Sequence, residues 1–342
     1  MLKKLLKGCL TAAMVTAMAV SVSAETTLKW SGNAAATLEQ TTTVVDGGDG
    51  VTVMDMYSSG DLDLKASVAG DQWTGMAKIE MDFNAAGVSA VDDLYVEMQS
   101  DALTIMFGEN DIIGIGQGGD YLGEIDNTLG WGDGDEIPGE DGWLQVSLNE
   151  VGLKVFLGLN HVDPDDDATG DAYDRTAFGV TFAKSFGMID LGFQYVSLST
   201  KRDENNGSAV AEESKYDGLT ATEMALAVTA NISEKMAVSF NYVADAYTAG
   251  TDGADEVKTT TMALFFDMGL SDTMGFTVHY GQESEDDGAV VTTQTVLHGT
   301  LKVTTGGVDH YVAYESIKDA SDADGDDDDT TSTFGYTMKV GF

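Results

Sequence analysis

Carboxylates are the side chains of this sequence best suited to chemistry, because they are numerous and gather in short segments. The segment DPDDDATGDAYD at 163–174 spaces its first aspartates two residues apart, as in the start of a calcium-binding EF-hand loop. Ala168 stands where that loop needs Gly, and Asp174 where a bidentate Glu is usual, so we do not expect a true EF-hand. We expect weak binding of Ca²⁺ or another divalent cation by loop aspartates, with a merely salt-adapted, hydrated surface as the alternative. The candidate ligands are Asp163, Asp165, Asp167, Asp326 and Asp328.

The longest acidic segment is NDIIGIGQGGDYLGEIDNTLGWGDGDEIPGED at 110–141, which holds nine acids and no Lys or Arg. It is too long for an ordinary connection between two elements. It also contains apolar residues such as Ile112, Ile115 and Leu122, enough to pack against a surface. A loop that lies inside a lumen needs both features, and the alternative is an outward-facing flap. In the first case, the acids expected to form a constriction are Asp111, Asp120, Glu124 and Asp126.

Residue patterns of the common catalytic sites do not occur. The histidines are expected near different strand ends, without metal-ligand spacing; they are His161, His279, His298 and His310. The stretch GIGQGG at 114–119 resembles a dinucleotide-binding loop only weakly and lacks the strand–turn–helix context that gives such a motif meaning. We therefore predict that the protein is not an enzyme and needs no cofactor.

The first 24 residues are predicted to be a secretory signal peptide. Three lysines precede a short apolar stretch, and the small residues Val22, Ser23 and Ala24 suit cleavage before Glu25. The alternative, a membrane anchor, is disfavoured by the shortness of that stretch. The expected mature domain, 25–342, contains no cysteine, so no disulfide is expected. Removal of three lysines takes the net charge from −41 to −44, which argues against nucleic acid and anionic headgroups as partners.

Beyond the signal peptide, apolar residues alternate with polar or small ones from end to end. Phe334, Tyr336, Met338, Val340 and Phe342, for example, share one parity. This period of two predicts strands with one apolar face, and their length suits strands tilted across a bilayer. The predicted strands are 26–39, 51–68, 73–83, 91–99, 102–109, 142–149, 152–162, 174–185, 188–199, 217–231, 235–247, 258–271, 274–284, 291–304, 307–317 and 331–342.

Short and long connections alternate along this series, which predicts a sixteen-stranded transmembrane antiparallel β-barrel. The alternative, a soluble β-sandwich, would show similar alternation but fits poorly with the signal peptide. Seven connections are short turns. The eight long ones are 40–50, 84–90, 110–141, 163–173, 200–216, 248–257, 285–290 and 318–330. If the last strand pairs with the first, the barrel closes without an exposed edge.

Parity then predicts which charges face the interior. Where neighbours such as Leu28 and Ile79 point to lipid, the adjacent lysines point inward; these are Lys29, Lys65 and Lys78, on the first three strands. Small outward residues on the same strands suit close contact with another wall. They are Ala34, Ala36, Ala66, Gly75 and Ala77.

Over its whole predicted mature length the sequence resembles the Gram-negative general porins, the trimeric, sixteen-stranded kind. The resemblance rests on the signal peptide, on the terminal strand ending in Phe342, and on the strand LTIMFGEND at 103–111 that precedes the longest loop. It implies that 110–141, the third long loop, folds into the lumen and narrows the pore, so that its acids form a constriction opposite Lys29, Lys65 and Lys78. It also implies a homotrimer and recognition of Phe342 by the barrel-assembly machinery.

We therefore expect a passive diffusion channel of the outer membrane for small hydrophilic solutes and ions. Acids at its mouth and neck predict cation selectivity, because a pore with low-dielectric walls focuses the field. The alternative is an outer-membrane barrel whose acidic loops bind calcium and serve adhesion or envelope structure.

Overall fold

The computed structural model describes nine segments of the chain, within which every regular element is a β-strand. The segments are 26–44, 50–69, 74–84, 87–109, 143–162, 173–202, 219–248, 256–321 and 329–341. In these segments no helix is long and apolar enough to cross a membrane.

Sixteen strands are formed by the described residues, in the number that the apolar alternation predicts. They are β1 (Thr26–Val44), β2 (Val51–Ala69), β3 (Thr74–Asn84), β4 (Gly87–Gln99), β5 (Leu103–Glu109), β6 (Trp143–Leu148), β7 (Leu153–Val162), β8 (Tyr173–Phe186), β9 (Ile189–Arg202), β10 (Thr220–Ser233), β11 (Met236–Thr248), β12 (Glu256–Gly269), β13 (Met274–Asp286), β14 (Val291–Thr305), β15 (Val308–Ser321) and β16 (Asp329–Gly341).

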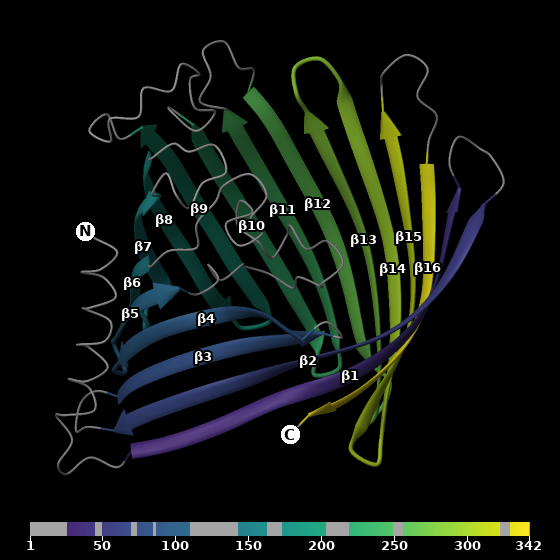
Figure 1. The fold of residues 1–342 in the computed structure, drawn as a ribbon, viewed down its shortest axis with the longest axis horizontal. Coiled ribbons are helices and arrows are strands. Elements are labelled where there is room, and N and C mark those ends of the chain that lie inside the picture. Colours follow the sequence, from purple (N-terminus) through teal and green to yellow (C-terminus); the bar gives the residue numbers. More distant parts are fainter. Residues whose placement is uncertain are drawn as a thin grey trace.

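Each strand pairs with its neighbours in the sequence, and β1 pairs with β16, so the sheet is a closed antiparallel barrel (Figure 1). The closing seam runs from Asn33 opposite Gly341 to Val44 opposite Thr330. Within it the hydroxyl groups of Thr37 and Thr337 are hydrogen-bonded at 2.9 Å. Closure satisfies the backbone groups of both terminal strands, as a bilayer requires of any chain that spans it.

The two faces of the sheet have opposite character, which the two-residue period of a strand makes possible. On β10, Glu223, Ala225 and Ala227 are buried on the inner face, whereas Met224 and Leu226 are exposed on the outer face. Large apolar side chains are likewise exposed on the outer face of the other strands, for example Phe240, Leu264 and Tyr280. This is the apolar-out pattern of a barrel that faces lipid.

One predicted connection is wrong. The sequence pattern predicts a long loop at 84–90, but β3 continues to Asn84 and β4 begins at Gly87, so only residues 85–86 lie between them. Two register shifts in the β3–β4 pairing, between Ile79 and Met81 and between Asp82 and Phe83, explain the error. A β-bulge adds a residue and breaks the alternation from which a strand is recognised in a sequence.

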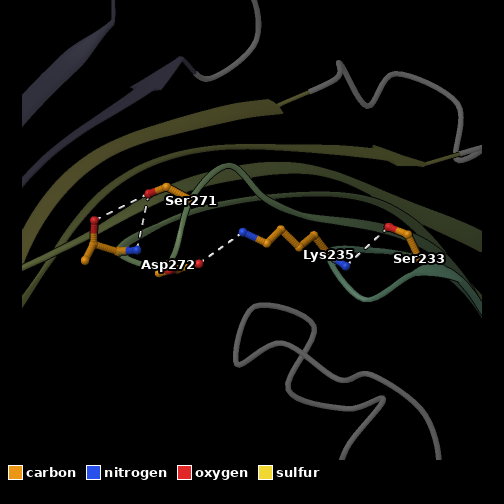
Figure 2. Close-up of polar contacts among 5 residues, drawn as sticks. Ser233, Lys235, Ser271 and Asp272 are labelled. Carbon is orange, nitrogen blue, oxygen red and sulfur yellow. Dashed lines mark hydrogen bonds and ion pairs between the residues drawn. The ribbon is translucent and has the colours of Figure 1, made fainter.

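The short turns lie at one end of the barrel, where an ion pair and a hydrogen bond connect two of them (Figure 2). Lys235, in the turn after β10, forms an ion pair of 3.1 Å with Asp272, in the turn after β12. The backbone N–H of Gly269 also donates to the Lys235 carbonyl at 2.7 Å. Within each turn a serine side chain accepts from the backbone: Ser233 from Lys235 N–H, and Ser271 from Thr273 N–H. These contacts fix the geometry of adjacent hairpins at this rim.

Candidate pore-lining site

The inner face of the sheet, called the lumenal face below, is lined mainly by polar, charged and small residues. Among the described side chains it presents fourteen carboxylates and five lysines. Strand pairing places these acids on it: Glu39, Asp55, Asp61, Glu97, Asp190, Glu223, Asp245, Asp267, Glu283, Glu285, Asp309, Glu315, Asp319 and Asp329. The lysines are Lys29, Lys65, Lys154, Lys302 and Lys339. The described lumenal face is therefore strongly acidic.

Strand register brings the three sequence-predicted lysines into one row. Lys29 is the Cα partner of Lys65 across β1 and β2, and Lys65 is the partner of Lys78 across β2 and β3. Lys29 and Lys65 are exposed. Lys29 is the fourth residue of β1 and Lys78 the fifth of β3, so this lysine row lies near the rim that carries the short turns.

Acidic groups lie beside the lysine row. Asp61, four residues before Lys65 on β2, accepts hydrogen bonds from the backbone N–H and the side-chain amide of Asn33. Glu97 on β4 lies close enough to Lys65 and Lys154 to interact with both ammonium groups electrostatically. Our sequence analysis missed Lys154, although the outward neighbours Leu153 and Val155 bracket it by the same parity rule that found Lys65. This wall thus mixes both signs of charge.

The acids predicted to form the constriction lie outside the described residues, as do the predicted divalent ligands. The former are Asp111, Asp120, Glu124 and Asp126, and the latter are Asp163, Asp165, Asp167, Asp326 and Asp328. Within the described segments no three His, Cys, Asp or Glu side chains are grouped closely enough to hold a metal ion.

Two histidines that were expected near different strand ends are in fact neighbours in the middle of the lumenal face. His279 on β13 and His298 on β14 are Cα partners, and their ring centroids lie 4.6 Å apart. The ring of Phe265 meets His279 edge-on at 5.3 Å. His298 Nδ1 lies 3.5 Å from a carboxylate oxygen of Glu315, and its Nε2 lies 2.5 Å from the hydroxyl oxygen of Thr300. Sequence reasoning missed this cluster because only the β13–β14 register brings the two rings together.

Farther round the barrel the lumenal face carries an apolar patch. Its members are buried and come from β10, β11, β12 and β14: Ala225, Ala227, Val243, Ala263, Phe265 and Val296, with Ile317 of β15 packed against them. Apolar side chains on the inner wall of a water-filled barrel are unfavourable unless they are covered. This lumenal apolar patch is therefore a candidate packing surface.

Taken together, a closed barrel with an apolar outer face and a polar, charged inner face is the architecture of a transmembrane channel protein. A family model described as Gram-negative porin matches residues 10–341. The chain belongs to the Gram-negative porin family and is an outer-membrane channel protein.

Solved structures with the same fold are porins and outer-membrane channels. An anion-selective porin from Comamonas acidovorans has a TM-score of 0.64 at 12% identity, with 93% of this chain and 100% of that chain covered. OmpT of Vibrio cholerae, in its trimer form, has a TM-score of 0.59 at 12% identity, covering 93% and 99%. The channel DcaP of Acinetobacter baumannii has 0.58 at 13% identity, covering 94% and 98%. A comparison with curated protein sequences gives no significant match.

Proposed function

We propose that this porin is a passive, cation-selective channel for small hydrophilic solutes and ions. The observation that supports this proposal is the excess of carboxylates over lysines among the described lumenal side chains. Such a surface raises the local concentration of cations, because the low-dielectric wall focuses the field into the water-filled lumen. The Comamonas acidovorans porin is anion-selective, but at 12% identity its likeness to this chain supports the fold alone.

We further propose that residues 110–141 narrow the pore and face the lysine row. The segment connects β5 to β6 and combines nine acids with several isoleucines and leucines. The lumenal apolar patch of β10–β14 offers a surface on which those apolar side chains can pack. The acids would then stand across the lumen from the lysine row. Deletion of 115–135 should raise single-channel conductance in planar bilayers, and unchanged conductance in a correctly inserted barrel would contradict the constriction.

Homotrimer formation is proposed for the outer face of β1–β3. Ala66 and Ala77 are Cα partners there, and Ala34 and Ala36 lie on the same face as exposed apolar residues such as Leu28. Small side chains allow two membrane-embedded walls to approach closely. Phe342 is proposed to be read by the barrel-assembly machinery. Light scattering in mild detergent tests the assembly, since a monomeric mass would count against a trimer.

The decisive measurement for selectivity is the reversal potential in a tenfold KCl gradient. We expect a value that favours K⁺ and that weakens with salt, because the Debye length falls from about 10 Å at 0.1 M to about 3 Å at 1 M. Added Ca²⁺ should lower the selectivity further if loop carboxylates bind it weakly. Preference for chloride would overturn the proposal, whereas insensitivity to Ca²⁺ would argue only against the divalent sites.

A further inference from the structure

Three charged side chains on the lumenal face form a group that the selectivity of the pore does not explain: Lys65 of β2, Glu97 of β4 and Lys154 of β7. The Glu97 carboxylate interacts electrostatically with both ammonium groups. Within the described residues, however, no ion pair joins Glu97 to either lysine. Each of the three side chains is at least partly exposed. The group therefore presents two positive charges and one negative charge that are near one another but not in direct contact.

Lys302 of β14 shows how a closed pair on the same face differs. Its Nζ lies 2.7 Å from a carboxylate oxygen of Asp309, and that carboxylate also accepts hydrogen bonds from the hydroxyl groups of Thr304 and Tyr311. The oxygens of Asp309 are thus largely occupied. Glu97 makes no such side-chain contact with another described residue, so its oxygens are available to a solute.

The arrangement of the strands explains why the charges of Glu97 and Lys154 stay apart. β5 and β6 lie between β4 and β7 (Figure 1), so three inter-strand steps, about 14 Å in all, separate the two backbones. Register adds an offset along the strands, because Lys154 is level with Gln99, through Ser147 and Thr104, rather than with Glu97. The two long side chains can approach across this distance without meeting.

The wall between these charges is polar. Thr104 of β5 and Gln145 and Ser147 of β6 belong to the lumenal face and are buried. The amide of Gln145 donates to the Ser147 hydroxyl at 3.2 Å, and the amide of Asn149 donates to the Thr104 hydroxyl at 3.0 Å. Because these groups are hydrogen-bonded within the wall, they leave the charged groups beside them to interact with a solute.

Two ammonium groups with a carboxylate between them match a small zwitterion. The carboxylate of an α-amino acid can lie against a lysine while its ammonium group lies against Glu97, so each end meets the opposite charge. A simple anion would be attracted by the lysines but repelled by Glu97, and a simple cation would meet the reverse. Lys29, the Cα partner of Lys65, adds to the positive side of the group.

We propose that Lys65, Glu97 and Lys154 form a subsite for small zwitterionic solutes such as amino acids. The subsite rests on the proposed function, since it names a solute class for the passive channel. It lies toward the rim that carries the short turns, because Glu97 is the third residue from the end of β4 and Lys154 is the second residue of β7. Water reaches the charged groups, so each contact is weak and concentrates the solute at the wall without holding it there.

The test compares the entry of alanine with that of lactamide, a molecule of similar size in which an amide and a hydroxyl replace the two charged groups. Neither molecule has a net charge, so the net charge of the lumen favours neither. Swelling of liposomes that contain the porin measures the two rates. In the unmodified protein alanine should enter roughly two- to fivefold faster than lactamide, the effect of one exposed ion-pair contact. Glu97→Gln and Lys154→Gln should each make the two rates nearly equal.

Asp267→Asn is the matched control. Asp267 is also a lumenal acid and also the third residue from the short-turn end of its strand, but it lies on β12, away from the subsite. Its replacement should leave the preference for alanine unchanged. If it lowered that preference as much as Glu97→Gln does, the proposal would be wrong. Equal rates in the unmodified protein would overturn the subsite alone, whereas exclusion of both solutes would overturn the passive channel as well.

Partial block of the K⁺ current in planar bilayers needs no variant and separates the zwitterion from simple ions. At equal concentration, alanine should reduce the current more than lactate or alaninamide does. This difference should vanish between 0.1 M and 1 M KCl, because the Debye length falls from about 10 Å to about 3 Å. Stronger block by lactate would show an anion site made by the lysines, and stronger block by alaninamide would show that Glu97 acts alone. Either result would overturn the proposal.

Discussion

The ring of Phe156 on β7 lies directly over Gly179, its Cα partner on β8, and fills the space that a side chain would occupy there. Phe156 is 2% exposed although it belongs to the lumenal face. A Cβ added to Gly179 would overlap three carbons of the ring. Because Gly179 has no side chain, the Phe156 ring can lie against the wall of the barrel. A larger residue at position 179 would push the ring into the pore.

Gly179→Ala should therefore destabilise the barrel by about 1–3 kcal/mol, the usual cost of overpacking. Unfolding in urea, followed by tryptophan fluorescence in detergent, measures this free energy. The matched control is Gly335→Ala, because Gly335 also lies on the lumenal face of a strand and has no atom within 4 Å of an added Cβ. Equal stability of the two variants would show that the ring of Phe156 moves away at little cost.

Gly152, in the turn between β6 and β7, has a φ of 78°, and an added Cβ would overlap the carbonyl oxygen of Ala183. Gly152→Ala should cost more than the roughly 1 kcal/mol expected for the left-handed conformation alone. Gly187 separates the cost of the left-handed conformation from the cost of the overlap. It has a φ of 67° and nothing within 4 Å of the added Cβ, so Gly187→Ala should show the conformational cost only. Thermal unfolding of the two variants gives the difference, and a smaller loss at Gly152 would contradict the predicted overlap.

The lysine row should reduce cation selectivity in the unmodified channel. Replacing Lys29 and Lys65 by glutamine removes two positive charges from the lumenal face and should raise the K⁺ to Cl⁻ permeability ratio by about two- to threefold at 0.1 M salt. Lys318→Gln is the control, because Lys318 lies on the outer face of β15. The permeability ratio is obtained from the reversal potential of the unmodified protein, the double variant and Lys318→Gln. If Lys318→Gln changed the permeability ratio by the same amount, the lysine row would affect the permeating ions no more than a lysine on the outer face does.

The ion pair between Lys235 and Asp272 should contribute little to stability. Their side chains are 55% and 95% exposed, so water screens the 3.1 Å contact. A double-mutant cycle with Lys235→Ala and Asp272→Ala should give a coupling free energy below about 1 kcal/mol, falling further at high salt. A coupling of several kcal/mol would show that this turn contact holds the rim together.

Much of this barrel could be predicted from the sequence because lipid imposes a rule on each strand separately. Every second residue of β10, for example, must be apolar where it faces lipid, so Met224 and Leu226 mark the outer face and Glu223 the inner one. The same parity predicts an inward orientation for Lys29 and Lys65, and register places them opposite each other. Where a bulge breaks the parity, as between β3 and β4, the prediction of a long loop at 84–90 was wrong.

What only the tertiary structure decided is which residues of different strands become neighbours. Alternation assigns a face to a residue but not a partner, since the partner depends on turn length, bulges and the stagger that closes the barrel. His279 and His298 therefore gave no signal in the sequence, although register sets their rings 4.6 Å apart beside Glu315. Phe156 over Gly179 has the same origin. A shift of one residue in either hairpin would place one member of the pair on the lipid face, and the contact would not exist.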